Sequence, residues 1–119
     1  MRAFKTHWFH KAANKAKIND AALCKAIKEV AEGKADDLGG NVYKKRLHQN
    51  RYRSIIVAKG ACYWIYEFLY AKKDLDNISD HELENFKILA KAYAGLNEQQ
   101  INRLLQKKKL VEICYEDNT

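Results

Sequence analysis

Helical periodicity of the apolar positions marks the first part of the chain. After a short strand expected over residues 1–6, the residues Trp8, Ala12 and Ala16 recur at intervals of four. Side chains at this spacing share one face of a helix. The pattern therefore predicts a first helix over about His7–Lys17, with these three residues on one stripe.

A second helix is predicted directly afterwards. Asn19 is a favourable N-cap residue, and Asp20 complements the positive helix start. Gly33 supplies the stop. The inward stripe of this helix is formed by Leu23, Ala26, Ile27 and Val30.

Three strand-like runs follow a loop over residues 34–41 that contains Gly39 and Gly40. The runs are Val42–Leu47, Tyr52–Lys59 and Cys62–Tyr70. Their connections are short, and Lys59-Gly60 is typical of a hairpin turn, so we expect an antiparallel meander. The third run is apolar on nearly both faces, which is typical of a central strand covered on both sides.

Two helices and a strand are predicted after a charged loop over residues 72–77. Ser79 and Glu82 form a capping box, and Gly95 ends the helix behind it. Asn97 caps a shorter helix, and a last strand is expected over about Leu110–Tyr115. The inward positions are Leu83, Phe86, Leu89, Ala90 and Tyr93 in the longer helix, then Ile101, Leu104 and Leu105 in the shorter one.

The resulting order is β-α-α-β-β-β-α-α-β, which predicts an α+β fold. We expect a small antiparallel sheet with two N-terminal helices packed on it and additional C-terminal helices, with the helices on one face of the sheet. The chain has 119 residues and is 47% hydrophobic, which suits a single domain over 1–119.

The three cysteines are far apart, and none forms a CxxC pair. We expect Cys24, Cys62 and Cys114 to be reduced thiols, mostly buried, in a cytoplasmic protein. No apolar run of 18 or more residues marks a membrane span.

Positive charge is concentrated in the first half of the chain. Residues 1–60 hold 14 Lys and Arg against 5 Asp and Glu, whereas residues 61–119 hold 8 against 10. The segment Lys44–Lys59 alone has six basic residues and no acidic one. Since these cations fall on expected strands, the pattern favours a shaped site for a polyanion over a solvated surface.

Motifs for nucleotide hydrolysis and serine hydrolase chemistry do not occur in the sequence. His7 and His10 are three residues apart on the first helix, but no nearby Cys or carboxylate joins them. We therefore expect neither a metal nor another cofactor.

The basic cluster has a chemistry of its own if the ligand is RNA. The 2′-hydroxyl of RNA can attack the adjacent phosphate, and Lys and Arg stabilise the charge that develops. A lysine or tyrosine whose pKa is lowered by a positive site can transfer protons, and His48 is a conventional base at the edge of the cluster. Strand alternation places Lys44 and Arg46 on one face, and Tyr43 and Lys45 on the other.

The end of the third run adds Tyr70 and Lys72 to this region. Aromatic rings beside cations suit RNA, whose unstacked bases lie on rings. We expect Trp64 and Phe68 to belong to the core, and Tyr70 and Lys72 to be functional.

An ordered set of short segments is similar to one branch of the RelE/HigB toxin family. The segments are Ile18–Ala26, Leu38–Arg46, Tyr52–Val57, Tyr70–Lys72 and Asp76–Ile78. The resemblance implies a ribosome-dependent, metal-independent endoribonuclease that cleaves mRNA. It also implies a cognate antitoxin, expected to be a helix-turn-helix protein.

The resemblance further implies which residues act. The catalytic candidates are Lys45, Arg46, Arg53 and Lys72, together with Tyr70. Arg53 is expected to bind the scissile phosphate, Lys45 and Arg46 to hold flanking phosphates, and Lys72 to transfer a proton or stabilise charge. The RNA-binding candidates are Lys44, His48, Arg51 and Lys73.

The sequence departs from this family pattern in two places. The connection over residues 47–51 is shorter than the Gly-rich connection of relatives, and Tyr115 is the nearest match to a final tyrosine that some of them use. A gyrase inhibitor of the ParE type and an RNA-binding module without cleavage remain open alternatives, because fold alone does not choose among them.

Overall fold

The computed structural model describes residues 1–60 and 62–114. The elements follow the predicted order with one addition, a two-residue strand β2 inside the expected loop. Their bounds are β1 Arg2–Thr6, α1 His7–Lys15, α2 Asp20–Ala31, β2 Asp36–Asp37, β3 Val42–Leu47, β4 Tyr52–Lys59, β5 Tyr63–Ala71, α3 Asp80–Ala94, α4 Glu98–Gln106 and β6 Leu110–Ile113.

The strands form a six-stranded sheet in the order β2-β3-β4-β5-β1-β6. The predicted meander of β3, β4 and β5 is confirmed, since each neighbouring pair is antiparallel. One pair departs from this rule: β1 lies parallel to β5. The sheet is therefore mostly antiparallel, and β5 is an interior strand as its two apolar faces predict.

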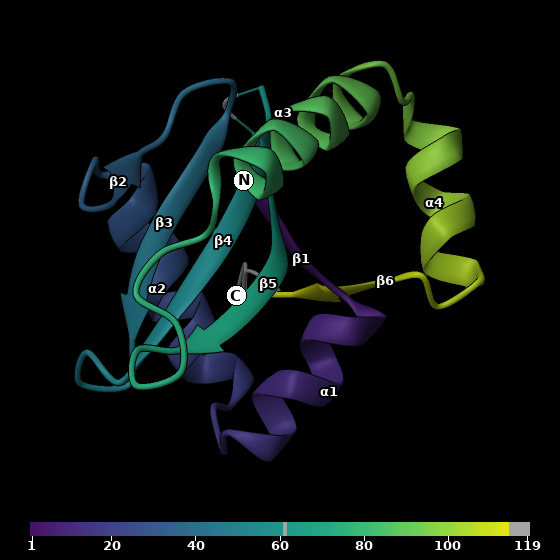
Figure 1. The fold of residues 1–119 in the computed structure, drawn as a ribbon. Helices are drawn as coiled ribbons and strands as arrows, with labels where there is room; N and C mark the ends of the chain where they lie inside the picture. The colour runs from purple at the N-terminus through teal and green to yellow at the C-terminus, as the bar shows by residue number, and fades with distance from the viewer. Residues whose placement is uncertain (61, 115–119) are drawn as a thin grey trace.

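Helices cover both faces of the sheet, so the expectation that they lie on one face is wrong (Figure 1). Alternate residues of β5 show the division, because Trp64 and Tyr66 pack with α1 and α2. Ile65 packs with α3 and α4. Since successive strand residues point to opposite faces, a strand that is apolar throughout needs cover on both sides.

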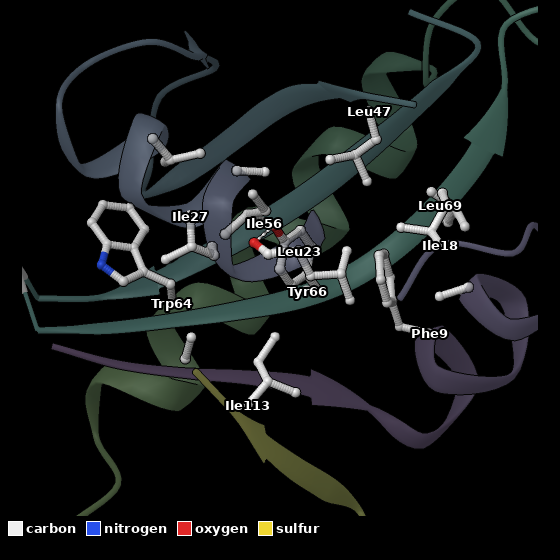
Figure 2. Packing of buried hydrophobic residues seen from close by; sticks show 14 of the residues in the cluster. Phe9, Ile18, Leu23, Ile27, Leu47, Ile56, Trp64, Tyr66, Leu69 and Ile113 are labelled. Atoms are coloured by element: carbon white, nitrogen blue, oxygen red, sulfur yellow. Dashed lines mark hydrogen bonds between the residues drawn. The ribbon is translucent and has the colours of Figure 1, made fainter. Parts of the chain in front are cut away.

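The larger core lies between the sheet and the two N-terminal helices (Figure 2). All four residues of the predicted α2 stripe are buried there, and Asn19 caps α2 by accepting a hydrogen bond from the Ala22 amide. Tyr66 anchors this core, because its ring stacks on Phe9 and its hydroxyl donates to the Leu23 carbonyl at 2.7 Å.

Helix α1 forms as predicted, and the residues that it buries lie outside the stripe of Trp8, Ala12 and Ala16. Phe9 and Ala13 are its buried residues, while Trp8 is 50% exposed. The helix also ends at Lys15, two residues early, and Lys17 adopts a left-handed φ of 59°. The stripe of Trp8, Ala12 and Ala16 therefore borders a surface groove.

The C-terminal predictions are confirmed in outline. Both caps form as capping boxes, at Ser79 with Glu82 and at Asn97 with Gln100. Gly95 ends α3. The last strand β6 stops at Ile113, and Tyr115 lies outside the described residues.

The expectation of three reduced thiols is wrong, because Cys24 and Cys114 form a disulfide. Cys114 follows β6, whose pairing with β1 returns the end of the chain to the core beside α2. The two cysteines are 90 positions apart, so their spacing carried no sign of the pairing. Cys62 is free and exposed.

Candidate functional site

Three of the predicted site residues form a row across β3, β4 and β5, one residue from the ends of these strands. Arg46 of β3 pairs in register with Arg53 of β4, and Arg53 pairs in register with Tyr70 of β5. Side chains directly opposite each other on neighbouring strands lie on the same face, about 5 Å apart at Cβ. Two arginines so placed repel each other, and a bound anion relieves this repulsion.

Arg53 is the buried member of the row, with 6% of its surface exposed. Its Nη1 donates to the Asn50 carbonyl at 2.8 Å and more weakly to the Tyr52 carbonyl at 3.4 Å. No carboxylate of the described residues forms an ion pair with it. A buried guanidinium that is held only by carbonyls keeps most of its charge for an anion.

Tyr70 is also buried, beneath Leu75, Ile78, Leu83 and Phe86. Its hydroxyl has no hydrogen-bond partner among the described residues. Burial raises the pKa of Tyr70, and the nearby Arg53 charge only partly opposes this. The expectation of a lowered pKa is therefore wrong for this tyrosine, which stays protonated at neutral pH and can donate a hydrogen bond.

A second group gathers where β4 and β5 meet the loops at their ends. The Lys72 amide donates to the Arg51 carbonyl at 2.9 Å, which joins the two loops. A cavity of about 780 Å³ lies here, and four predicted residues line it: His48, Arg51, Lys72 and Lys73. All four are exposed, so they can meet a ligand without any rearrangement.

The turn that carries His48 has an unusual backbone. His48, Gln49 and Asn50 have φ values of 56°, 56° and 72°, in the left-handed region that favours glycine. Each such residue costs on the order of 1 kcal/mol. This turn aims the Asn50 carbonyl at Arg53, and it belongs to the short connection over residues 47–51 that departs from the family pattern.

The structure does not bring Lys44 and Lys45 into these groups as free cations. Lys44 shares the face of Arg46, but its Nζ lies 3.0 Å from Asn77 Oδ1 and 3.5 Å from Asp36. Lys45 lies on the opposite face, as alternation predicts. Its Nζ is 3.2 Å from Glu29 and donates to the Lys34 carbonyl at 2.9 Å.

Sequence reasoning missed the exposed aromatic surface beside this site. Trp8 stacks on Phe68 with ring centroids 5.2 Å apart, and Phe68, a predicted core residue, is only partly buried. The two rings are 60 positions apart in the chain, and β5 and α1 bring them together. Spacing within either element gives no signal of this contact.

A metal site and a membrane span each place requirements on the described residues. No cluster of three or more His, Cys, Asp or Glu side chains in residues 1–60 and 62–114 is arranged to hold a metal ion. In the same part of the chain, every helix is too short or too polar to cross a bilayer.

Comparison with known families identifies the class of protein that this fold and site define. Residues 1–113 match the family model described as the RelE toxin of the RelE / RelB toxin-antitoxin system. The chain belongs to this RelE toxin family and is the toxin of a type II toxin–antitoxin pair, which implies a RelB-type antitoxin as its partner. Searches of curated proteins and of solved structures found no match.

Proposed function

We propose that this toxin is an endoribonuclease that cleaves mRNA on the ribosome, in the cytoplasm and without a metal ion. The observation that carries the proposal is the row of Arg46, Arg53 and Tyr70, with Lys72 directly beyond the end of β5. Cations and a protonated hydroxyl gathered on one sheet face are what phosphate transfer within RNA requires.

The proposed reaction begins with attack of the RNA 2′-hydroxyl on the adjacent phosphorus. The 2′-oxygen loses its proton, and His48, which lines the same cavity as Lys72, is the candidate acceptor. Arg46 and Lys72 stabilise the extra negative charge on the phosphate oxygens. The bond to the 5′-oxygen then breaks, and Tyr70 is the candidate donor that returns a proton to this leaving oxygen.

Access to the phosphate differs between the two arginines. Arg46 is exposed and can contact RNA directly. Arg53 and Tyr70 are buried, and residues such as Leu75 and Ile78 pack over Tyr70. We therefore infer that the segment over residues 72–79 shifts when RNA binds, so that Arg53 reaches the scissile phosphate.

Expression of single variants tests the proposal. Arg53→Ala and Lys72→Ala should each restore growth after induction, and mapping of RNA 5′ ends should show the loss of cuts inside translated codons. Arg53→Lys controls for the burial of Arg53, because it keeps the positive charge. Lys25→Ala on the exposed face of α2 is the matched surface control and should remain toxic.

Other outcomes discriminate among the alternatives. Full toxicity in both alanine variants, with the protein folded, contradicts the assigned site. An SOS response with intact mRNA indicates a gyrase inhibitor instead, and RNA binding without new 5′ ends indicates a binding module. Loss of cleavage on addition of a chelator contradicts the metal-independent mechanism.

The antitoxin can be assigned from the genetic neighbourhood. We propose that the RelB-type partner carries a helix-turn-helix, and the adjacent reading frame tests this. Growth should be protected when the two proteins are made together in cells. The two proteins should also purify as a complex.

A further inference from the structure

A groove lies between α1 and the end of β5, and it continues to the start of β4. Its first part, about 660 Å³, is lined by Trp8, Lys11, Lys15 and Phe68, among others. Tyr52 and Lys73 line both this part and the 780 Å³ cavity that holds Lys72. The two hollows are therefore one continuous surface that leads to the candidate catalytic residues.

An exposed aromatic ring stands at the outer end of this groove. Trp8 is 50% exposed and stacks on Phe68 at an interplanar angle of 25°. Phe68 is in turn 5.7 Å from the Tyr70 ring. An indole supported on one side and half-exposed is a platform on which another planar ring can stack.

Cations lie alongside this platform. Lys11 and Lys15 follow Trp8 by three and seven positions, which places them on the same side of α1. Across both hollows the basic residues are Lys11, Lys15, Lys17, Arg51, Lys72 and Lys73, against two acidic residues, Asp74 and Asp76.

The charges of these six cations have no acidic partner among the described residues. Lys44, Lys45 and Lys87, in contrast, each have one. The charge of the six is therefore not locally neutralised, and the groove is a positive surface that favours a polyanion.

We propose that this groove binds single-stranded RNA, with one unpaired base stacked on Trp8 and the neighbouring phosphates on Lys11, Lys15 and Lys73. The inference rests on the proposed function only in taking RNA as the ligand. The proposal extends the RNA-binding site from the scissile phosphate to a second contact on α1. The two contacts together fix the path of the RNA strand. Aromatic faces flanked by cations recognise RNA by this combination of stacking and charge.

Equilibrium binding of a short, unstructured oligoribonucleotide tests the proposal. The oligonucleotide carries 2′-O-methyl groups, so it cannot be cleaved, and a fluorescein label, so that anisotropy reports binding. Trp8→Ala should weaken binding by between about 5-fold and about 150-fold, the range for loss of one base–aromatic stack. Trp8→Phe keeps a ring and should retain most of the affinity.

Intrinsic fluorescence gives an independent readout, because Trp64 is buried and Trp8 is exposed. RNA should quench the tryptophan emission of the native protein, and this quenching should disappear in Trp8→Phe. Thermal melting shows whether each variant is folded.

The lysines are tested by a matched pair of double variants. Lys11→Gln with Lys15→Gln should weaken binding and reduce the slope of log affinity against log salt by about 1.4, since each contact to single-stranded RNA contributes about 0.7. Lys25→Gln with Lys28→Gln removes the same charge from exposed positions on α2 and should leave the slope unchanged. All four lysines are exposed, so the fold should tolerate the changes.

The results separate this inference from the proposed function. If Arg53→Ala abolishes cleavage while Trp8→Ala and the Lys11/Lys15 variant bind RNA normally, the nuclease assignment stands and the groove is not an RNA site. If Trp8→Ala weakens binding of the antitoxin but not of RNA, the groove docks protein and the proposal is overturned. Weaker RNA binding in both Trp8→Ala and the Lys11/Lys15 variant supports the groove as an RNA site, whether or not the protein cleaves RNA.

Discussion

Arg53 and Tyr70 face each other across β4 and β5, and neither has a side-chain partner among the described residues. The arginine donates only to backbone carbonyls, and the tyrosine hydroxyl makes no hydrogen bond. Both side chains are buried, and the Tyr70 hydroxyl is a buried polar group without a partner, which costs stability. A cost of this kind is typical of residues kept for function.

Replacement of the tyrosine should separate stability from activity. Tyr70→Phe removes a buried hydroxyl that has no partner, so the free energy of unfolding should stay the same or rise by about 1 kcal/mol. Cleavage should fall by at least about 10-fold if Tyr70 donates the proton. Denaturant melts and a cleavage assay measure the two effects.

Tyr66→Phe is the matched control for this prediction. Its hydroxyl donates to the Leu23 carbonyl, so its loss should lower the free energy of unfolding by about 1–3 kcal/mol. Cleavage per folded molecule should be unchanged. Equal activity of Tyr70→Phe and the native protein contradicts the role assigned to Tyr70.

The two faces of β3 should respond differently to substitution. Arg46→Ala changes an exposed side chain, so it should reduce cleavage and alter stability by less than about 0.5 kcal/mol. Lys45→Ala removes the contacts with Glu29 and the Lys34 carbonyl, and should lower stability by about 1 kcal/mol while RNA affinity is unchanged. A loss of RNA affinity in Lys45→Ala contradicts this prediction and assigns Lys45 to the RNA-binding site.

Glu67 should give the protein a pH-dependent stability. Burial raises the pKa of Glu67 to about 7 from its ordinary 4.5, and the hydrogen bond from Tyr93 only partly offsets this. The folded state therefore binds a proton more tightly than the unfolded chain does. The contribution of Glu67 to the free energy of unfolding is greatest below pH 4.5. This contribution falls by up to about 3 kcal/mol as the pH rises through 7.

Glu67→Gln isolates this effect, because the amide can still accept from Tyr93 and does not titrate. Unfolding free energies of both proteins are measured from pH 4 to pH 8. The value for the native protein should fall relative to that for the variant as the pH rises. A constant difference across this range contradicts the raised pKa.

The disulfide between Cys24 and Cys114 should make stability depend on redox conditions. It closes a long loop, and such a link contributes about 2–4 kcal/mol. A reductant and Cys24→Ser should therefore lower the melting temperature by similar amounts. Cys62→Ser changes only the free, exposed cysteine and should melt like the native protein, whereas indifference of the native protein to reductant contradicts the bond.

Local sequence signals were sufficient wherever a structure depends on near neighbours. The cap at Asn19, the capping box at Ser79 and the bounds of β3 and β4 were all predicted, because a few adjacent side chains decide them. Strand alternation also separated Arg46 from Lys45, since side chains in a strand alternate by geometry alone.

What the sequence by itself determined is the α+β class, the succession of elements and the residues that carry positive charge. Tertiary structure decided how these are combined. The parallel pairing of β1 with β5, the helices on both faces and the link between Cys24 and Cys114 all join positions far apart in the chain. The same holds for Trp8, whose spacing marked only a helix stripe, because β5 places Phe68 against its ring and the side chain stays 50% exposed. Spacing records only which side chains share a face, whereas packing between elements decides what that face meets.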